Sequence, residues 1–552
     1  MANKGVDIYI GATSLTTALG NKRATLDGMH RGECGLRFSD RYAMYAGEVD
    51  VTLKEGYTRF ESMLIAEIES VVQQSGITLM SGDTQLIIST TKGNVELLAD
   101  DCENIAARAF LYTSAEAISD YFNAANRAIV ISNACISGVS AFVVAREKLL
   151  RGECKHIIVA GGDALCEFIT SGFASFKSIS AQPCRPYDAA RDGLTLGEAA
   201  GAVLLTTDCV KADAARIFLA GGAITNDANH ISGPSRTGDG LYYAISEAMR
   251  EAGVSSEDVG FVNTHGTATR YNDEMESKAV AWAQLDSKPL NSLKGHIGHT
   301  LGASGVVETI LCVEQLKQGY IFGTMGFSAS DTPHQLMVSA TEQHFDKRCC
   351  VKSASGFGGC NAAIVLDMEY RERGTVGDRR AWRVAAEYTL PHAEQPFAEF
   401  IRSEFKSLDQ SNMKFYKMSD MCKALYVAVE QLLRIEDFGD VPPTRRAIIL
   451  ANRSASLDTD VAHQRIVNQH LTEGASPAVF VYTLANVAAG EMCIRHKIQG
   501  DNTFFIENTH SEMVHQQAQH LIESGRADAV ICGWCDLLQE SWNVDIKLYK
   551  NN

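Results

Sequence analysis

Four short segments of this chain carry side chains that can attack, polarise or hold a substrate. The first is NACISG, in which Cys135 stands between an apolar run expected to be a strand and a segment expected to be a helix. Free backbone N–H groups and the dipole at a helix N-terminus favour a thiolate at such a junction. A dipole contribution of about 0.3–1 kcal/mol lowers a thiol pKa of about 8.5 by less than one unit, so a neighbouring group has to help. Taken alone, the motif also fits a buried structural cysteine.

The other three segments supply imidazoles, an ammonium group and backbone amides. His265, in VNTHGTAT, follows an expected strand, and strand ends are where α/β folds collect catalytic side chains. SLKGHIGHTLGASG carries Lys294 and His299 in a glycine-rich loop that lacks the P-loop order needed for a phosphate cradle. SASGFGGCN, at 353–361, is a glycine-rich turn able to aim N–H groups at an oxyanion. Each segment alone also fits a structural role, such as a close backbone approach or a tight turn.

The elements that would position these segments alternate between strands and helices. Apolar runs expected to be strands lie at 6–12, 85–90, 128–134 and 156–163, with a helix from about 137 to 151. A second series comprises strands at 200–207, 215–225, 259–266 and 358–369, with helices near 272–283 and 303–317. This alternation predicts a mostly parallel sheet covered by helices.

In this order and with these spacings, the four segments resemble the β-ketoacyl-acyl-carrier-protein synthases, the condensing enzymes of fatty acid and type II polyketide synthesis. The resemblance covers about residues 6–368 and includes RPYDAARDGLTLGEAAG (185–201), which is similar to the family stretch R-P-[FWY]-D-x-x-R-D-G-[FL]-x-x-G-E-G-A-G. It implies an α/β, thiolase-like fold, layered αβαβα and built from two related halves. We therefore expect an N-terminal half at 1–210 and a C-terminal half at 211–369.

The resemblance also implies a role for each matching residue. Cys135 matches the acyl-accepting nucleophile, and His265 and His299 match the two catalytic histidines. Lys294 matches the lysine that orients and electrostatically supports the site. Phe357 matches the gating phenylalanine, whose backbone N–H forms an oxyanion hole with that of Cys135. The positions expected to support the lysine and the loops are Thr267, Thr269, Asp273, Glu276 and Glu308.

The reaction implied is a decarboxylative Claisen condensation. Cys135 would take an acyl group from acyl carrier protein, malonyl-ACP would lose CO₂, and the resulting carbanion would attack the acyl-cysteine to give 3-oxoacyl-ACP. Neutral imidazoles at His265 and His299 suit donation to the enolate oxygen. No cofactor or metal is expected beyond the 4′-phosphopantetheine that carries the substrates. Lys177, in FASFKSIS, occupies the family's basic position for carrier-protein docking, although it also fits an ordinary solvated lysine.

Two positions depart from the family pattern beside the gating phenylalanine. Ser355 stands where most members have the first phenylalanine of S-F-G-F-G-G, and Cys360 replaces the usual threonine. The loss of an aromatic ring there widens the pocket or makes it more polar. We therefore expect a longer, stiff or aryl-bearing acyl chain in place of an ordinary saturated one.

A polar, charged segment at 370–381 is expected to be a linker to a tail, 382–552, that repeats the first half. The matching pairs are 445–456 with 84–93, 501–509 with 126–134, and 527–536 with 155–163. The interval from Cys135 to Asp163, counted back from Asp536, places the missing cysteine near Asn508 or Thr509. The tail has no equivalents of His265, Lys294 or His299, and it resembles the truncated chain-length-factor-like subunits of aryl polyene and flexirubin pathways.

The strand before Cys135 is expected to pair with its repeat in the tail. Synthases of this family dimerise through that strand, so AIVIS (128–132) would face TFFIE (503–507) in an internal pseudo-dimer, or the same strand would form a homodimer. A structure that places the two strands far apart would exclude the internal pair. CGWC, at 532–535, has the spacing of redox or zinc sites but lacks a second ligand pair, so we expect packing residues there.

Composition argues against several other classes of protein. The 552 residues are 45% apolar, which predicts a globular chain of about three packed units. A net charge of −17 argues against nucleic acid or an anionic membrane as partner. Fifteen scattered cysteines, no signal-like N-terminus and no long apolar window favour the cytoplasm.

Three alternative functions remain open from the residues. A thiolase-type enzyme would need a second catalytic cysteine in a C-x-G-G-G-x-G turn, which is absent from the sequence. A non-catalytic length-setting or scaffold subunit would have lost the nucleophile, whereas Cys135 is present. A Cys/His hydrolase would use Cys135 and His265 but would leave Lys294 and His299 unexplained.

Overall fold

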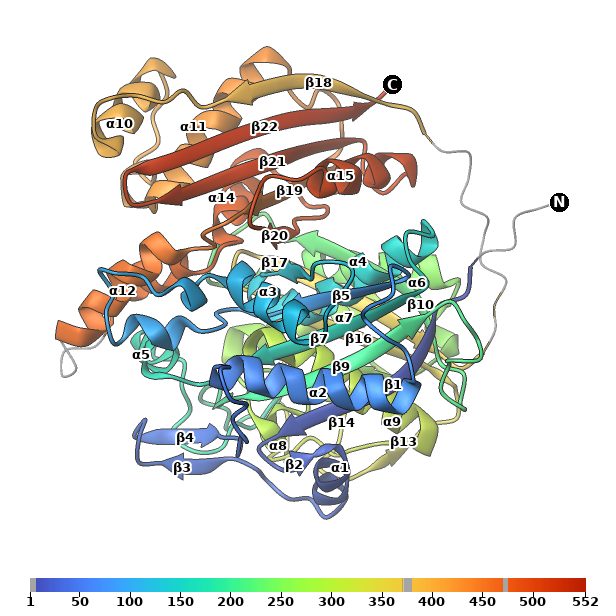
Figure 1. Ribbon diagram of the computed structural model, residues 1–552. Coiled ribbons are helices and arrows are strands. Elements are labelled where there is room, and N and C mark those ends of the chain that lie inside the picture. Colours follow the sequence, from blue (N-terminus) through green and yellow to red (C-terminus); the bar gives the residue numbers. More distant parts are fainter. Residues whose placement is uncertain (1–5, 370, 372–379, 470–474) are drawn as a thin grey trace.

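A computed structural model describes residues 6–369, 371, 380–469 and 475–552. The linker predicted at 370–381 lies largely outside the described residues. In Figure 1 the tail, coloured orange to red, lies above the rest of the chain and contacts it through β20 and α12. The molecule therefore has a layered unit, residues 6–369, which we call the catalytic unit because it carries the predicted catalytic residues, and one further sheet with its own helices.

The first half of the catalytic unit is a mixed sheet. In order across the sheet its strands are β6 (Ile129–Ile131), β5 (Thr84–Ser89), β7 (His156–Asp163), β9 (Ala199–Thr206) and β1 (Tyr9–Thr17). β6, β5 and β7 run parallel to one another, whereas β9 is antiparallel to β7 and β1 to β9. The central strands are buried along nearly their whole length, because helices cover both faces of the sheet.

The second half forms another mixed sheet. Its strands, in order, are β10 (Phe218–Asn226), β17 (Cys360–Asp367), β16 (Cys349–Gly356), β11 (Val259–Asn263), β12 (Pro289–Asn291) and β14 (Met337–Val338). The remaining short strands are β2 (Gly20–Asn21), β3 (Arg37–Ser39), β4 (Met44–Gly47), β8 (Leu196–Gly197), β13 (Tyr320–Ile321) and β15 (Gln343–His344).

Helices α4 (Ser137–Leu150) and α9 (Ser304–Gln318) lie between the two sheets and pack against each other. α2 (Arg59–Ser75) covers the outer face of the first sheet, and α6 (Asp239–Ala252) covers that of the second. The other helices of this unit are α1 (Lys22–His30), α3 (Leu111–Tyr121), α5 (Glu167–Ser175), α7 (Arg270–Trp282) and α8 (Lys294–Ile297). The predicted αβαβα layering is confirmed, and it places the start of α4 and the loop before α9 in the same buried region.

The tail repeats the first sheet strand for strand. Its order is β20 (Phe504–Ile506), β19 (Arg446–Asn452), β21 (Ala529–Leu538), β22 (Ser541–Asn551) and β18 (Trp382–Thr389), with the same pattern of parallel and antiparallel pairs. Its helices are α10 (Phe397–Ser407), α11 (Asp420–Ile435), α12 (Leu457–Gln469), α13 (Pro477–Phe480), α14 (Val487–His496) and α15 (Met513–Glu523). Cys532 and Cys535 of CGWC are both buried in β21.

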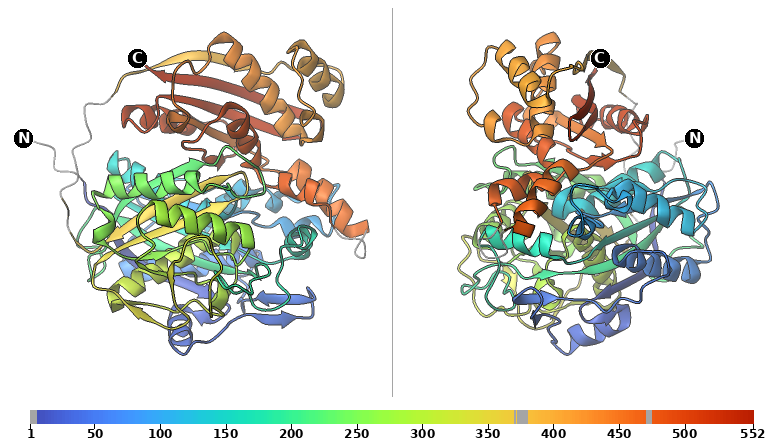
Figure 2. Two further views of the ribbon diagram at one scale, coloured as in Figure 1. Left: turned by 180° about the vertical axis from the view of Figure 1, so that it is seen from behind. Right: turned by 60° about the vertical axis from the view of Figure 1, so that its left-hand side comes forward.

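The two related sheets join at their edges. β6 pairs antiparallel with β20, with Ile131 opposite Phe505 and Val130 opposite Ile506. The predicted pairing of these strands within one chain is therefore confirmed. It makes one continuous sheet from β1 to β18, and the tail lies against the strand that leads into Cys135. Figure 2 shows from two sides that α12 extends from the tail to the teal segment around α5, with which it is in contact.

Among the described residues, no single helix has the length and apolar character of a membrane span, although the bent pair Pro477–Thr483 and Val487–His496 passes a test of length and composition.

Candidate active site

Cys135 lies where the sequence predicts, at the junction between β6 and α4. It sits in a short 3₁₀ turn, Ala134–Ile136, entered through a left-handed residue, Ala134, with φ of 47°. The side chain is 8% exposed. The nucleophile candidate is thus held by a strained turn between a buried strand and the helix shared by both sheets.

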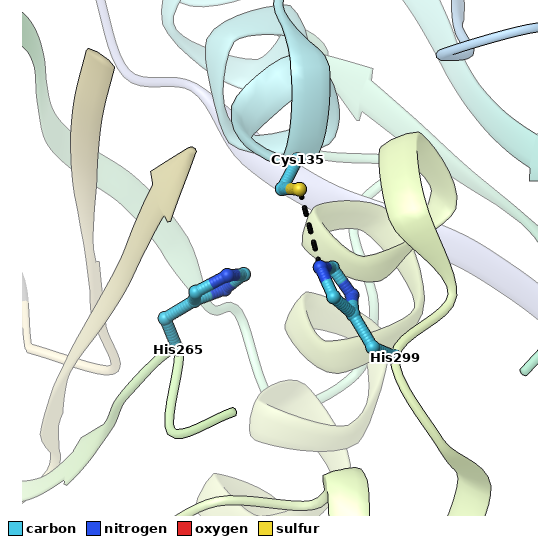
Figure 3. A group of neighbouring side chains, drawn as sticks. All are labelled: Cys135, His265 and His299. Carbon is cyan, nitrogen blue, oxygen red and sulfur yellow. Dashed lines mark hydrogen bonds between the residues drawn. The ribbon is translucent and has the colours of Figure 1, made fainter. Parts of the chain in front are cut away.

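Two histidines from the second half converge on this cysteine. His299 Nε2 lies 3.1 Å from Cys135 Sγ. The ring centroid of His265 lies 5.0 Å from that of His299, with the ring planes at 87°. Figure 3 shows both imidazoles pointing toward the thiol from separate segments. These three residues also form a group with ligand atoms within 4.8 Å of one another, the one such cluster found in the described part of the chain.

The tautomer of His299 follows from its backbone contact. The N–H of Leu301 donates to His299 Nδ1 at 3.3 Å, and the hydroxyl of Ser304 lies 3.1 Å from the same nitrogen. A backbone N–H can only donate, so Nδ1 accepts and the proton of a neutral imidazole resides on Nε2. His299 therefore presents an N–H donor toward Cys135 and the substrate.

Both histidines are neutral at physiological pH. Burial, followed by the charges of Lys294 and Lys352, lowers the pKa of His299 well below its ordinary value. Burial and Lys294 do the same to the pKa of His265. His265 Nδ1 finds no hydrogen-bond partner among the described residues. Two neutral imidazoles are therefore available as donors to an oxygen that becomes negative during a reaction.

The charge state of Cys135 differs from the expectation of a favoured thiolate. Burial raises its pKa to about 12, while Lys294 and the backbone N–H groups of Cys135 and Phe357 oppose that rise. The free energy lost when the thiolate is taken out of water exceeds the stabilisation that the turn and the helix N-terminus give it. The resting residue is a thiol, and its proton has to leave as the substrate arrives.

Lys294 is fully buried and paired. Its Nζ lies 2.5 Å from Glu308 Oε1, and Lys352 Nζ lies 2.6 Å from Glu308 Oε2. Burial alone would raise the pKa of Glu308, but the two ammonium groups outweigh it and hold that pKa below its usual range. The sequence prediction of Glu308 as a partner of Lys294 agrees with this geometry. The sequence prediction missed Lys352. A charged residue inside the apolar strand β16 is unusual, and this could have identified it.

The other predicted supporting residues hold the loops around the histidines. Glu276 accepts the N–H groups of His265 at 2.8 Å and Gly266 at 2.6 Å. Asp273 accepts the N–H of Tyr187 at 2.8 Å, so it anchors the segment that carries the RPYD motif. Thr267 and Thr269 lie with hydroxyl oxygens 2.9 Å apart on the wall of the cavity described below. Asp273 and Glu276 thus act on backbone and not directly on the thiol.

The glycine-rich turn lies against the nucleophile as expected. A Cβ on Gly356 would lie 3.2 Å from the backbone nitrogen of Cys135. Gly358 and Gly359 adopt φ of 90° and 70°, the left-handed region that favours glycine, which lets the turn reverse beside the thiol. The N–H of Phe357 faces Cys135 and lowers its pKa. The two N–H groups predicted as an oxyanion hole therefore point into one space.

The departures from the family pattern lie in this turn. Ser355 donates its hydroxyl hydrogen to Asn361 Oδ1 at 2.7 Å and lines the cavity. Cys360 is buried, with Sγ 3.2 Å from the carbonyl oxygen of Phe357. Asn361 in turn donates to Asp227 Oδ1 at 2.8 Å.

A cavity of about 260 Å³ leads to the three converging side chains. Its floor is lined by Cys135, His265 and His299. Its upper part is lined by the exposed Tyr271 and the half-buried Phe176. Lys177 is exposed and directly follows Phe176. The predicted docking lysine is therefore next to the cavity, although it does not reach the site.

A second cavity, of about 10 Å³, also borders Cys135, and the tail supplies part of its wall. Its walls include Cys135, Phe173 and Phe357 from the catalytic unit, and Phe480 and Leu484 from the tail. The ring of Phe480 lies 5.4 Å from that of Phe173, which stacks on Phe357 at 6.1 Å. Sequence reasoning missed Phe480 and Leu484, because neither belongs to a motif that carries chemistry.

At the end of this cavity, Lys92 from the catalytic unit meets the tail in a buried ion pair. Lys92 Nζ lies 2.7 Å from Asp460 Oδ1 and 3.1 Å from Ser456 Oγ, and it also donates to the carbonyl of Thr483. Burial lowers the pKa of Lys92 and raises that of Asp460 to about 6, while their mutual attraction opposes both shifts. A further cavity of about 10 Å³ is lined by both members of this pair together with Ala455 and Leu457.

The tail holds no second site of the same kind in its described residues. β6 ends at Ile131, four residues before Cys135, and β20 ends at Ile506, so the strand ends place His510 at the cysteine position. The predicted positions, Asn508 and Thr509, were counted back from Asp536 and come earlier because α15 has 11 residues where α4 has 14. All three are exposed.

Residues 57–209 match the family described as Beta-ketoacyl synthase, N-terminal domain, and residues 217–328 match Beta-ketoacyl synthase, C-terminal domain. The chain is 32% identical over 304 residues to 3-oxoacyl-[acyl-carrier-protein] synthase 2 of Mycobacterium leprae, which covers 50% of this chain and 72% of that protein. It is 26% identical over 411 residues to the chloroplastic 3-oxoacyl-[acyl-carrier-protein] synthase I of Hordeum vulgare, over 65% and 88% of the two chains. The match spans smaller shares, 59% and 46%, of related synthases from Schizosaccharomyces pombe and Arabidopsis thaliana.

Two solved structures are informative about the fold. The ketosynthase ApeO, solved in complex with its chain length factor ApeC from Xenorhabdus doucetiae, is 26% identical and superposes with a TM-score of 0.59 over 66% of this chain and 98% of that one. The PfaC keto synthase-chain length factor is 15% identical but superposes with a TM-score of 0.79 over 99% of this chain and 78% of that one. The second likeness includes the tail and concerns the fold alone.

Proposed function

Because this chain belongs to the β-ketoacyl synthase family, we propose that it extends an acyl chain held on Cys135 by decarboxylative condensation with malonyl-ACP. The observation that carries the proposal is the convergence of Cys135, His265 and His299, with Lys294 and Glu308 buried behind them. A Cys/His hydrolase needs a base that removes a proton from the thiol or from water. Here the tautomer of His299 presents a proton instead.

The first step is acyl transfer to the cysteine. As the thioester carbonyl of the acyl carrier enters, Cys135 Sγ bonds to its carbon and the bond to the phosphopantetheine sulfur breaks. The thiol proton of Cys135 passes to the departing sulfur, so charge is conserved. The oxyanion of the tetrahedral intermediate accepts hydrogen bonds from the backbone N–H groups of Cys135 and Phe357, which both face the thiol.

The second step uses the histidines. Loss of CO₂ from malonyl-ACP leaves an enolate, and the N–H of His299 and one N–H of His265 donate to its oxygen. The enolate carbon then attacks the acyl carbonyl, the C–S bond to Cys135 breaks, and the thiolate takes up a proton from solvent. Lys294 holds the positive potential that favours these anions while Glu308 keeps the ammonium in place.

The carrier protein is proposed to dock at the cavity mouth. Phosphopantetheine is a long, narrow arm, and the cavity of about 260 Å³ runs from the surface near Tyr271 to Cys135. Lys177 lies exposed beside that mouth and provides a positive charge for an acidic carrier protein. No cofactor or metal is proposed besides this arm, and the cytoplasm is the proposed compartment.

The tail is proposed to act as a chain-length-factor-like wall for the acyl group. Phe480 and Leu484 close the cavity on the acyl side of Cys135, and the ion pair of Lys92 and Asp460 forms its far end. The flat rings of Phe173, Phe357 and Phe480 favour contact with a conjugated or aryl chain over a flexible saturated one. This supports an acyl chain of the polyene or aryl-bearing kind.

The test is a competition among starters. The enzyme is incubated with malonyl-ACP and an equimolar mixture of saturated, polyenoyl and aryl-polyenoyl carriers, and products are identified by intact mass spectrometry of the carrier protein. We expect 3-oxoacyl-ACP from the unsaturated or aryl starters first. A Cys135→Ala variant is the control for non-enzymatic extension. Preferential extension of short saturated chains would contradict the substrate class, and no extension of any starter would contradict the proposed reaction.

A further inference from the structure

Asn486 of the tail contacts the catalytic turn of the other unit. Its Nδ2 donates to the carbonyl oxygen of Phe357 at 2.8 Å, and the same nitrogen lies 3.6 Å from Cys360 Sγ. The side chain is 2% exposed. This hydrogen bond joins the tail to the residue whose N–H faces Cys135.

The surroundings are shaped for this contact. A Cβ on Gly358 would lie 2.6 Å from Asn486 Nδ2, so any other residue at 358 would displace the asparagine. A Cβ on Gly490, in α14, would lie 2.6 Å from the carbonyl oxygen of Gly358. The start of α14 and the turn thus approach each other as closely as two backbones allow.

The chemistry of Asn486 indicates a role other than stabilising its own helix. It stands at the position before α14, where an asparagine commonly caps the helix, yet its side chain makes no capping hydrogen bond. Its Oδ1 has no hydrogen-bond partner in the described residues, although it is buried. A buried amide that leaves one group unsatisfied is destabilising, so the fold gains nothing locally from an asparagine here. The hydrogen bond that Asn486 does make is the one to Phe357.

We propose that Asn486 is a positioning residue for acyl transfer, through which the tail holds the oxyanion-stabilising N–H of Phe357 in place. The N–H and the carbonyl of Phe357 lie in successive peptide planes that are joined only by φ and ψ of this residue, so fixing the carbonyl limits how far the N–H can turn away from Cys135. Among the described residues, the other hydrogen-bond partner of this carbonyl is Cys360 Sγ at 3.2 Å, and a thiol is a weak donor. The asparagine therefore supplies the directional restraint, and the tail completes the active site instead of only walling its pocket.

The inference rests on the proposed function, and it makes the two half-reactions respond differently. Acyl transfer to Cys135 uses the N–H of Phe357, whereas decarboxylation of malonyl-ACP uses His265 and His299. Displacing an oxyanion donor lowers the rate about 10- to 100-fold, whereas deleting one lowers it about 10²- to 10³-fold. A purely structural residue would weaken both half-reactions together.

The experiment measures each half-reaction in Asn486→Leu and Asn486→Asp. Acyl transfer is followed by rapid quench and intact mass of the acyl-enzyme, and decarboxylation by acetyl-ACP formation in a Cys135→Ala background. Both variants are expected to slow acyl transfer about 10- to 100-fold with decarboxylation unchanged. In Asn486→Asp, the deficit relative to the unsubstituted enzyme shrinks as pH falls, because a protonated carboxyl can again donate to the Phe357 carbonyl and burial raises its pKa. Asn486→Asp also serves if Asn486→Leu does not fold.

The matched control is Asn502→Leu. Asn502 is another tail asparagine, 2% exposed, whose Nδ2 donates at 2.8 Å to a backbone carbonyl of the catalytic unit, that of Thr225. Its replacement is expected to lower the thermal midpoint as Asn486→Leu does and to leave acyl transfer unchanged. Normal acyl transfer in both Asn486 variants, or equal slowing in Asn502→Leu, overturns the inference. Absence of the acyl-enzyme in the unsubstituted protein would instead refute the proposed function.

Discussion

The junction after β6 and the junction after β20 come from the same half-fold, yet only the first is reactive. In both copies an apolar strand ends and a helix follows a few residues later. After β6 the chain is buried beneath α9 and the loop at Leu301–Ala303, whereas residues 508–512 after β20 are exposed. The described residues hold no second half that covers this junction of the tail. A nucleophile there would have no counterpart of the converging pair His265 and His299, so the position is open to polar side chains.

A strand-end carboxylate shows what the two copies still share. Asp163, at the end of β7, accepts the N–H groups of Thr91 at 3.0 Å and Lys92 at 3.1 Å. Asp536, in β21, accepts the N–H of Ser454 at 2.9 Å, in the loop after the neighbouring parallel strand. Asp163 also accepts the N–H of Gly302 at 2.7 Å, a contact for which the tail has no partner segment. Both copies therefore keep a strand-end carboxylate that holds the loop after the neighbouring strand. Only the first copy has the segment around Gly302, which that carboxylate also holds.

The largest contrast is expected from the nucleophile position itself. Cys135→Ala should lower condensation by about 10⁴-fold or more, because no other group can hold the acyl chain, while decarboxylation of malonyl-ACP continues. Carrier-protein mass spectrometry measures both products. Adding His510→Cys to this variant should restore nothing, since that position is exposed and has one neighbouring imidazole, His515, in place of the converging pair His265 and His299. Chain extension by either variant would contradict the distinction between the copies.

The next effect concerns the ion pair between the copies. Lys92→Met leaves the Asp460 carboxylate buried without its partner and should cost about 3–5 kcal/mol in the free energy of unfolding. Lys92→Met with Asp460→Leu removes both charges, so stability should recover and the products should become longer as the cavities on either side merge. Denaturant unfolding and product mass measure the two results.

The control for that pair lies on the same two segments. Arg465, also on α12, pairs with Glu103 at 2.8 Å, but both side chains are exposed and neither lines the two cavities beside Lys92. Arg465→Met with Glu103→Gln should change stability by less than about 1 kcal/mol and leave product length unchanged. Unchanged product length in the Lys92 and Asp460 double variant would show that this pair does not end the acyl pocket.

The two strand-end carboxylates should separate function from stability. Asp163→Asn replaces an acceptor of N–H groups with a donor, so it should cost about 1.5–3 kcal/mol and slow condensation, because the loops that flank Cys135 and His299 lose their common anchor. Asp536→Asn should cost about 1 kcal/mol and leave the rate unchanged. Thermal unfolding and steady-state rates are compared. Equal loss of rate in both variants would mean that the tail loop also shapes the active site.

The smallest effect is a difference in thiol titration. Because burial raises the pKa of Cys135 to about 12, its thiolate fraction should grow tenfold per pH unit through neutral and mildly alkaline pH without levelling off. In His510→Cys the new thiol is exposed, so its alkylation should level off near the ordinary pKa of about 8.5. Peptide mass spectrometry after iodoacetamide treatment reports both sites. A plateau for Cys135 near neutrality would show that the resting enzyme holds a thiolate.

Much of the fold was predictable because its signals are local. The apolar runs that became β5, β7 and β9 are buried on both faces, and strands of that kind read as continuous hydrophobic stretches. The repeat in the tail was visible for the same reason, as was the partner strand of β6. The exact cysteine equivalent was not, because α15 has 11 residues where α4 has 14, so a count back from Asp536 does not reach the position that the strand end indicates.

The candidate site was predictable in its members but not in its energetics. Cys135, His265 and Lys294 stand in motifs with distinctive glycine spacing. Lys352 and Asn486 belong to no such motif, because a lysine within a strand and an asparagine before a helix carry no distinctive signal in the sequence. The sequence did not predict that the pKa of Cys135 is raised. A helix dipole can be inferred from the local sequence, whereas burial depends on distant segments.

The sequence by itself determined which chemistry this chain can perform and that its first half occurs twice, because side-chain types and hydrophobic periods are local properties. Only the tertiary structure decided how these parts act on one another. It brings His299 to Cys135 across 164 positions and Asp460 to Lys92 across 368. It also sets Asn486 on the Phe357 turn. Such pairings depend on how two sheets join at β6 and β20, and burial at that joint fixes the strength of each charge and hydrogen bond.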